Sequence, residues 1–376
     1  MTTDTQLDFL PGNTVSILLN GAEAYPVMLR AIHDATTSIY LAHFCVQKGK
    51  VSDLFYQPLL NAARRGVKVY FLLDAYGAGE ADPIHLKKMR LDHINITWFN
   101  PRQMLHPLRY NKRLHKKILV VDNKVGFTGG IGISDIWLSG ANYPAPWRDT
   151  QFRLEGPIVG KMTESFIKSW NRFSSEQLLE QELEPAPVKG GRIPMALADT
   201  APLDSADRKN PTKLYGRLIK EAKDTIEIST AYFGPTLAMR RYLQTAAKRG
   251  VRIRILTNGP HPSHRNAMQA GRLHYGSFLK AGIELYEYQP TKTHAKIMVI
   301  DDKRSVFGSS NLNTRSFLHD EEMNIVADDA RLAASLTEQF EADVQESKKI
   351  DLESWQNRPF TEKVRQSITS LGRYFF

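Results

Sequence analysis

The chain has 376 residues, 42% hydrophobic and 24% charged, the ordinary composition of a globular protein with a substantial core. A formal net charge of +10 favours anionic partners, namely phosphate groups, nucleic acid or an acidic membrane surface, and does not choose among them. The one cysteine, Cys45, excludes an internal disulfide and a thiolate metal cluster, and we interpret it as a small buried hydrophobe.

The first fifteen residues, MTTDTQLDFLPGNTV, lack the basic start and apolar run of a signal peptide. No stretch approaches the roughly 18 consecutive apolar residues of a spanning helix. We therefore expect a cytoplasmic protein that is soluble or bound peripherally to the inner face of the cell membrane.

In chain order, three segments of the first half recur in the second. TSIYLAHF, AARRGVKVYFLLD and RLHKKILVVDNKVGFTGG correspond to DTIEISTAYF, AAKRGVRIRILTN and KTHAKIMVIDDKRSVFGSS. The first pair has the β-rich alternation of a strand, and the second reads as a helix end, a glycine turn and a buried strand. Three paired segments in the same order indicate an internal duplication.

Between the two copies, residues 184–210 are rich in Pro, Gly, Ala and Asp, and a boundary is expected near 185–191. We predict two units, 1–188 and 189–376. Strands alternating with helices imply an α/β fold of two similar lobes, each a mixed β-sheet flanked by helices, with the active site at the lobe interface.

The third segment carries the chemistry as H-x-K-x4-D. His115 and Lys117 are two apart on a predicted strand, so their side chains share a face. The aspartates open predicted turns on the opposite strand parity, and we interpret them as structural, holding the turn or meeting a neighbouring cation. One such motif is typical of a solvated strand edge, whereas two copies on apolar strands indicate a functional site. The six motif residues are His115, Lys117, Asp122, His294, Lys296 and Asp301.

The double motif resembles the phospholipase D superfamily. The flanks RLHKK, FTGG, WRDTQFRLEGP, TAYFGP and GSSNLNTRSF resemble its bacterial cardiolipin synthase branch, and the resemblance runs from about Ser38 to about Val326. It implies two lobes that bring both histidine–lysine pairs to one cleft, with neither a metal nor a cofactor.

By this resemblance, one imidazole attacks phosphorus and forms a phosphohistidine, and the other protonates the leaving alcohol and then deprotonates the incoming one. Family analogy assigns His115 as the nucleophile and His294 as the acid/base, an order that the residues alone do not fix. Lys117 and Lys296 would hold the non-bridging phosphate oxygens.

The resemblance also implies supporting residues. Asn311, with Ser309 beside it, would donate a hydrogen bond to the phosphate. Glu322 would accept from the second imidazole and Asp149 from the first, the alternative for both acids being a surface charge or an ordinary salt bridge. The chain departs from the branch at Gly132, where an Asn is usual, which puts a head-group contact in doubt.

Three functions compete on these residues. The first is a phosphatidyltransferase of cardiolipin synthase type, which moves a phosphatidyl group to a hydroxyl of phosphatidylglycerol or a similar alcohol. The second is a phospholipase D hydrolase or a nucleic-acid phosphodiesterase, and the third a non-catalytic module that binds anionic lipid. The expected partner is an anionic phospholipid at a membrane surface, with nucleic acid the weaker alternative and no obligate protein partner.

The C-terminal residues 363–376 offer a contact with such a surface. Val364, Ile368, Leu371 and Phe375 recur at helical spacing beside basic residues. This segment either docks on anionic lipid or packs on its own domain.

Overall fold

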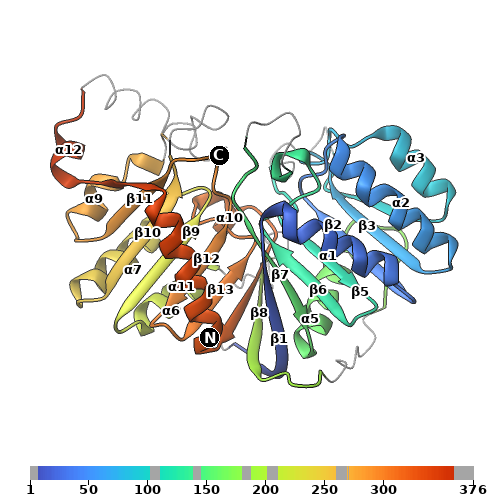
Figure 1. Cartoon of the computed structure of the whole chain (residues 1–376), viewed down its shortest axis with the longest axis horizontal. Helices are drawn as coiled ribbons and strands as arrows, with labels where there is room; N and C mark the ends of the chain where they lie inside the picture. The colour runs from blue at the N-terminus through green and yellow to red at the C-terminus, as the bar shows by residue number, and fades with distance from the viewer. Residues whose placement is uncertain are drawn as a thin grey trace.

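The computed structural model describes residues 7–101, 111–138, 145–179, 188–200, 211–259, 269 and 271–359. Within them the strands form one 15-stranded sheet with helices against it (Figure 1). No helix in these ranges combines the length and apolar character needed to cross a membrane. The predicted amphipathic segment at 363–376 lies outside the described residues.

The first half contains strands β1 (Leu10–Leu19), β2 (Ser38–His43), β3 (Lys68–Asp74), β4 (Asn95–Phe99), β5 (Ile118–Val121), β6 (Val125–Gly129) and β7 (Thr150–Glu155). Its helices are α1 (Asn20–Asp34), α2 (Lys50–Arg64), α3 (Pro83–Leu91), the short 3-10 helix η1 (Asp135–Trp137) and α5 (Pro157–Asn171).

The second half contains strands β8 (Ile193–Thr200), β9 (Thr225–Thr230), β10 (Arg252–Asn258), β11 (Glu284–Tyr288), β12 (Lys296–Ile300), β13 (Arg304–Gly308), β14 (Glu322–Asp328) and β15 (Ser347–Ile350). Its helices are α6 (Pro211–Glu221), α7 (Leu237–Lys248), α9 (Tyr275–Leu279), α10 (Thr314–Leu318), α11 (Ala330–Gln345) and α12 (Leu352–Gln356).

The two halves repeat one topology, which confirms the predicted duplication. The strand order β4-β3-β2-β5-β6-β7 matches β11-β10-β9-β12-β13-β14. In each set the first three strands are parallel, and the motif strand, β5 or β12, pairs antiparallel with β2 or β9. The predicted helix–glycine–strand turns end α2 and α7, where Gly66 and Gly250 adopt the positive φ angles of 91° and 98° that glycine tolerates.

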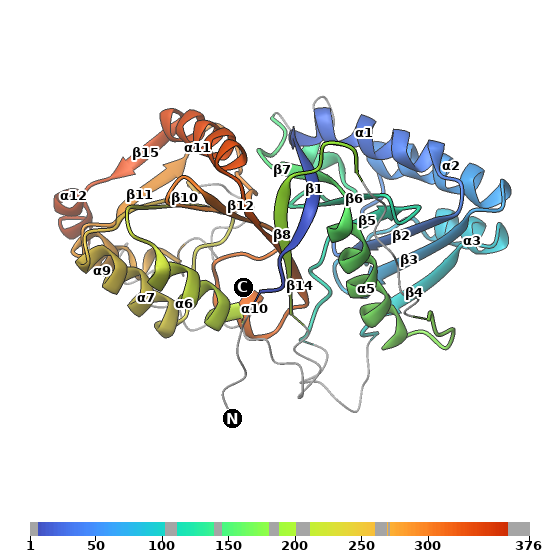
Figure 2. The same ribbon diagram turned by 90° about the horizontal axis from the view of Figure 1, so that it is seen from below.

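The halves are joined more closely than the predicted pair of separate sheets. β1 pairs antiparallel with β7 on one side and with β8 on the other, and β8 pairs with β14, so the sheet is continuous across the middle of the molecule (Figure 2). One buried cluster spans this joint, where the rings of Phe152 and Phe307 stack with centroids 3.9 Å apart.

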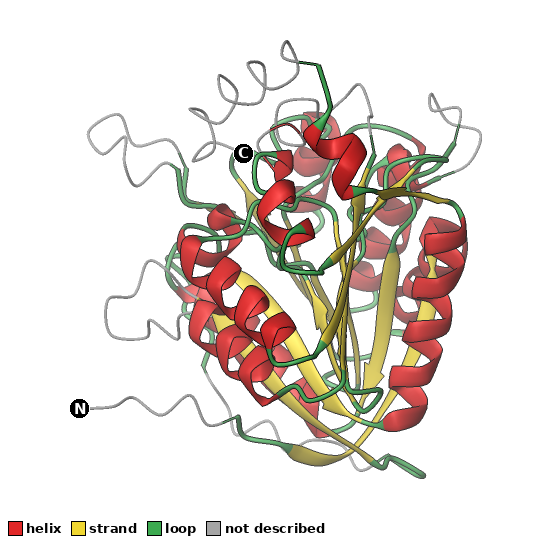
Figure 3. Cartoon of the chain, turned by 90° about the vertical axis from the view of Figure 1, so that its left-hand side faces the viewer, coloured by secondary structure: helices red, strands yellow, loops and turns green. Residues whose placement is uncertain are grey.

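Helices cover both faces of the sheet (Figure 3). In the first half, Leu119 belongs to the same buried cluster as residues of α1 and α2, whereas Ile118 and Val120 belong to the cluster that includes α5. This alternation confirms the predicted parity of the motif strand. The strand begins later than predicted, at Ile118, so His115 and Lys117 lie just before it rather than on it.

Candidate active site

The first histidine lies just before the motif strand. His115 precedes β5, and its Nδ1 lies 2.9 Å from both carboxylate oxygens of Glu322. Lys117 donates from Nζ to the backbone carbonyl of His115 at 3.0 Å. The ring of Phe44 packs edge-on against the imidazole with centroids 5.3 Å apart. With Nδ1 held by the carboxylate, Nε2 is the nitrogen left for a substrate.

The second histidine has the same arrangement. His294 Nδ1 lies 2.9 Å from Oδ2 of Asp149, and the indole of Trp137 donates to the same oxygen at 2.9 Å. Lys296, the first residue of β12, donates from Nζ to the His294 carbonyl at 2.6 Å. The rings of Trp137 and Trp147 pack against the imidazole at 5.5 and 5.4 Å between centroids.

The partners of the two histidines are exchanged between the halves, so the expected pairing was wrong. Glu322 was expected to accept from His294 and Asp149 from His115, whereas the structure has the opposite. The reason lies in the backbone, because the residues that precede β7 and β14 form parallel bridges with the motif segment of the other half. Leu114 bridges Glu321, and Arg148 bridges Thr293.

Burial and neighbouring lysines set the charge of the site. Burial, followed by the charges of both motif lysines, lowers the pKa of His115 well below its usual value. The pKa of His294 is lowered in the same way, by burial and then by Lys296, Lys292 and Lys117. Each imidazole is thus influenced by the motif lysine of the other half as well as by its own. This agrees with the crossed carboxylates, which bring both pairs to one site.

Burial also acts on the partners of the histidines. It raises the pKa of Asp149 to about 6 and that of Glu322 to about 7, and it lowers the pKa of Lys296 to about 7. Burial thus favours the uncharged form of each group. A bound phosphate diester would favour the charged form of the lysines instead, because a nearby anion stabilises the ammonium group.

The motif aspartates lie at the far end of the motif strands and do not contact the histidines. Asp122 accepts from the backbone N–H groups of Thr36, Thr37 and Ser38 at 2.9, 2.7 and 3.0 Å, where β2 begins. Burial raises and these hydrogen bonds lower the pKa of Asp122, to about 2 in balance.

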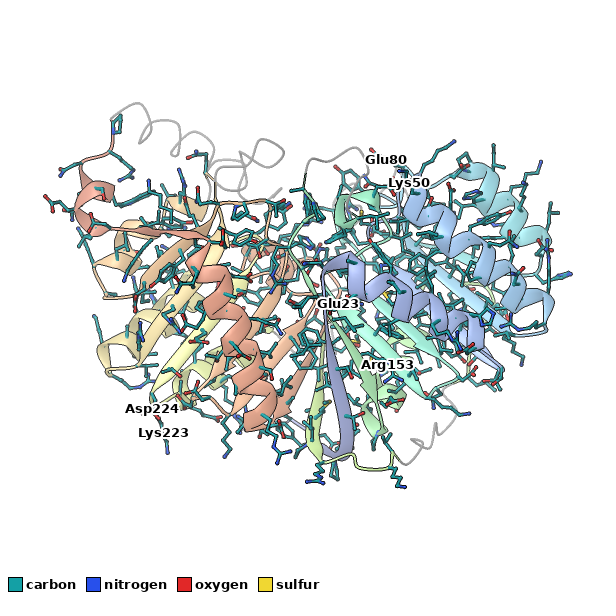
Figure 4. The ribbon with its side chains drawn as sticks, in the orientation of Figure 1. Glu23, Lys50, Glu80, Arg153, Lys223 and Asp224 are labelled. Atoms are coloured by element: carbon teal, nitrogen blue, oxygen red, sulfur yellow. The ribbon has the colours of Figure 1, made fainter. Side chains whose placement is uncertain are left out.

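Asp301 is the equivalent of Asp122 in the second half. It accepts from the N–H groups of Lys223, Asp224 and Thr225, and the first two lie at the lower edge of the molecule in Figure 4. The structural interpretation of both aspartates is confirmed, and they are not part of the reacting group.

The loop after β13 supports Glu322. Ser309 donates from its hydroxyl to Glu322 Oε2 at 2.5 Å, so it acts on the carboxylate. Asn311 is buried, and among the described residues its side-chain oxygen has no hydrogen-bond partner. Its predicted contact with phosphate stays a prediction.

The surroundings of Gly132 leave little room for a side chain. A Cβ atom there would lie 3.0 Å from the backbone oxygen of Cys45 and 3.0 Å from the ring of Trp137. An Asn at this position would require these neighbours to move by a few tenths of an ångström.

Several site residues were not predicted, among them Trp137 and Lys292. Trp137 holds Asp149, and nothing in its spacing indicated this contact. Lys292 is buried, with Nζ 2.6 Å from the Tyr232 hydroxyl and 4.0 Å from the Trp147 ring centroid, and burial lowers its pKa well below the usual value. A signal existed for Lys292, because Arg113 holds the same position, two residues before the histidine, in the first half.

Comparison with known proteins agrees with this site. Residues 28–139 and 215–344 match the family described as "Cardiolipin synthase, PLD-like domain". The chain is 31% identical over 362 residues to a probable cardiolipin synthase of Bacillus subtilis, covering 96% of this chain and 71% of that protein. It is 31% identical over 368 residues to cardiolipin synthase A of Pseudomonas aeruginosa, covering 98% of this chain and 72% of that protein.

Among solved structures, phosphatidylserine synthase of Haemophilus influenzae has the same fold. It superposes with a TM-score of 0.74 at 14% identity, covering 98% of this chain and 97% of that one. Two family matches, one in each half, and two motif copies at a shared site lead to one assignment. The chain belongs to the phospholipase D-like family of cardiolipin synthases.

Proposed function

We propose that the protein is a phosphatidyltransferase of cardiolipin synthase type. It transfers a phosphatidyl group from one phosphatidylglycerol to a hydroxyl of a second, or of a similar alcohol. The observation that carries this proposal is that the two imidazoles make the same contact, each with a carboxylate of the other half. Each has Nδ1 bound to a carboxylate of the other half at 2.9 Å, which leaves two Nε2 atoms for one phosphodiester.

The reaction divides into two balanced displacements. In the first, Nε2 of His115 attacks phosphorus and the bond to the glycerol oxygen breaks. His294, which carries a proton on both ring nitrogens when the phosphodiester anion is bound, gives its Nε2 proton to the departing glycerol. In the second, His294 takes the proton of the incoming hydroxyl, whose oxygen displaces His115 from phosphorus. The ammonium groups of Lys117 and Lys296 offset the charge on the phosphoryl oxygens in both steps. The family resemblance sets the roles of the two histidines.

The test offers phosphatidylglycerol vesicles and, separately, plasmid DNA, both in EDTA. Cardiolipin together with released glycerol supports the transferase. Phosphatidic acid or nicked DNA would instead indicate the hydrolase or the nucleic-acid phosphodiesterase, and no turnover the binding module. His115→Ala and His294→Ala should each nearly abolish transfer while the far-UV circular dichroism is kept, and substantial residual activity in either would contradict the two-histidine mechanism.

The order of the histidines is open to a trapping experiment. Rapid acid-free quenching with radiolabelled phosphatidylglycerol should leave label on His115 in the wild type. Label on His294 would reverse the assignment.

The same proposal places the enzyme at the cytoplasmic surface of the membrane, with anionic phospholipid as its partner. The net charge of +10 favours such a surface. Flotation with vesicles that contain phosphatidylglycerol, compared with neutral vesicles, tests this binding, and equal flotation with both would count against it. We further propose a division into units 1–188 and 189–376, since the two family matches fall on either side of it.

A further inference from the structure

Each carboxylate that accepts from a histidine follows a charged residue whose backbone binds the opposite motif segment. Arg148 precedes Asp149, donates its N–H to the Lys292 carbonyl at 2.9 Å and accepts from the His294 N–H at 2.6 Å. We call residues 148–149 the first strap. The backbone alone therefore ties this strap to both sides of the His294 segment.

The second half supplies an equivalent strap, residues 321–322. Glu321 donates its N–H to the Arg113 carbonyl at 2.8 Å and accepts from the His115 N–H at 2.9 Å. The two straps thus have the same backbone contacts, and each crosses to the other half.

The side chain of Arg148 fixes the first strap to a helix of the opposite half. Its Nε donates to Oδ1 of Asp343, on α11, at 2.9 Å, and both side chains are about nine-tenths buried. A terminal nitrogen of the same guanidinium donates to the backbone carbonyl of Asp149 at 2.7 Å and to the hydroxyl of Thr150 at 2.9 Å. One group therefore joins α11 to the residue that accepts from His294.

The side chain of Glu321 does the same for the second strap, with the charges reversed. It is 1% exposed, accepts from the Ser169 hydroxyl of α5 at 2.6 Å and pairs with Arg172 directly after that helix. The Nζ atom of Lys116 lies 3.7 Å from the Glu321 carboxylate and 2.7 Å from that of Asp199. Here the strap carries the anion and the opposite half supplies the cations.

The two halves reach this result with different residues. Where the first half has Lys116 beside the motif histidine, the second has Ala295, which lines the same small cavity under α11 as Arg148 and Asp343. The strap residue and its main partner have exchanged the signs of their charges between the halves, yet an ion pair joins each strap to the region of a helix in the opposite half. This indicates that the connection itself matters. The particular residues used for it differ.

We infer that Arg148 and Glu321 are positioning residues, whose ion pairs with α11 and α5 hold Asp149 and Glu322 where they fix the tautomers of His294 and His115. Neither residue needs to touch substrate. Loss of the pair leaves a buried charge without its partner and frees the strap to shift, and a displacement of about 1 Å at a reacting group can cost about 10²-fold in rate. The inference rests on the proposed function only for the identity of that reaction.

The test removes both charges of one pair, so that no unpaired charge stays buried. In Arg148→Met/Asp343→Leu we expect kcat to fall about 10²-fold with KM within about threefold, because the groups that bind phosphate are untouched. The matched control is Arg304→Met/Asp328→Leu, an Arg–Asp pair between β13 and β14 that lies within one half and contacts no strap. The control should keep kcat within about threefold of the wild type.

A readout independent of activity is the ¹⁵N spectrum of the His294 imidazole, assigned with His294→Gln. The wild type and the control should show one tautomer with the proton on Nδ1, and the double variant a mixture of tautomers. If the double variant does not fold, Asp343→Asn takes its place and should show the same change to a smaller extent. An unchanged tautomer with wild-type kcat would overturn the inference. A wild type that makes no cardiolipin would overturn the proposed function and leave the tautomer comparison valid.

Discussion

The two carboxylates that hold the histidines should respond differently to the same chemical change, carboxylate to amide. Asp149 is surrounded by donors only. Its Oδ2 accepts from Trp137 Nε1 and His294 Nδ1, both at 2.9 Å, and its Oδ1 accepts from the Thr150 N–H at 2.8 Å. In Asp149→Asn the amide nitrogen must face a donor in either orientation, and of the three neighbours only His294 can become an acceptor, by taking the other tautomer.

Glu322 differs because one of its partners is a hydroxyl. Ser309 donates to Oε2 at 2.5 Å, yet it can turn its hydrogen to the Met323 carbonyl, 3.3 Å away, and accept from an amide instead. In Glu322→Gln the amide nitrogen can therefore face Ser309, and the amide oxygen can still accept from His115. What is lost is the negative charge on that acceptor.

The magnitudes follow from these hydrogen-bond counts. An amide that forces the wrong imidazole tautomer costs about 10⁴-fold in the serine-protease triad, so we expect Asp149→Asn to lower kcat/KM by about 10³–10⁴-fold. Exchanging a charge-assisted bond for a neutral one costs about 1–2 kcal/mol, so we expect about 5–30-fold for Glu322→Gln.

The assay is the initial rate of glycerol release from phosphatidylglycerol vesicles in EDTA. Thermal unfolding of each variant is the control for loss of fold. The reasoning is refuted if Glu322→Gln is as damaging as Asp149→Asn, or more so, while both variants unfold near the wild-type temperature.

Three further predictions follow from the contacts of single residues. In Gly130→Ala, the new Cβ would lie 2.2 Å from Oδ1 of Asp149, so kcat should fall at least about 10²-fold; a rate within threefold of the wild type would contradict this contact. Burial lowers the pKa of Lys296 to about 7, and phosphate binding needs the charged ammonium, so kcat/KM should fall as pH rises above about 7. Lys296→Arg should move that decline to higher pH, because a guanidinium stays charged. If the decline stays at the same pH in this variant, another group titrates. Asp122→Ala should lower the free energy of unfolding in urea by about 2–3 kcal/mol at pH 7. The pKa of Asp122 is about 2 in the folded protein and about 3.9 unfolded, so the difference should be complete above about pH 4 and shrink as pH falls toward 2; an equal difference at pH 2 and pH 7 would contradict this origin.

The duplication was predictable because each copy is encoded locally. Helix, glycine turn and buried strand follow from short-range patterns, and the alternation of Ile118, Leu119 and Val120 follows from the period of a strand. The structural role of Asp122 could be inferred for the same reason, since a residue on the opposite parity at the end of the strand faces away from the motif pair.

The crossed pairing of carboxylates and histidines could not be obtained in this way. Glu322 follows His294 in the chain, and the pairing expected from the family resemblance joined residues of the same half. The pairing is decided by which half's strand edge each strap contacts, and a spacing within one half carries no information about the docking of the other. The continuous sheet was missed on the same grounds, because the β1–β8 contact joins strands from different copies.

The burial of the charged strap residues could not be predicted from the sequence for a different reason. Arg148 and Glu321 are ordinary charged residues next to a motif, and solvated surface charge is the commoner outcome for such positions. Their burial depends on α11 and α5 closing over them, which is a property of the packed molecule.

The exchange of carboxylates explains why the two halves act as one enzyme. His115 and Glu322 belong to different copies, as do His294 and Asp149, so neither imidazole has its acceptor until the halves are docked. The straps tie that docking to the backbone of each histidine segment. The reaction requires one imidazole to attack while the other gives up a proton, and both demand a fixed tautomer at the same time. A small shift of one half against the other would disturb both imidazoles together, so the reaction depends on the joint between the halves as well as on the motif residues.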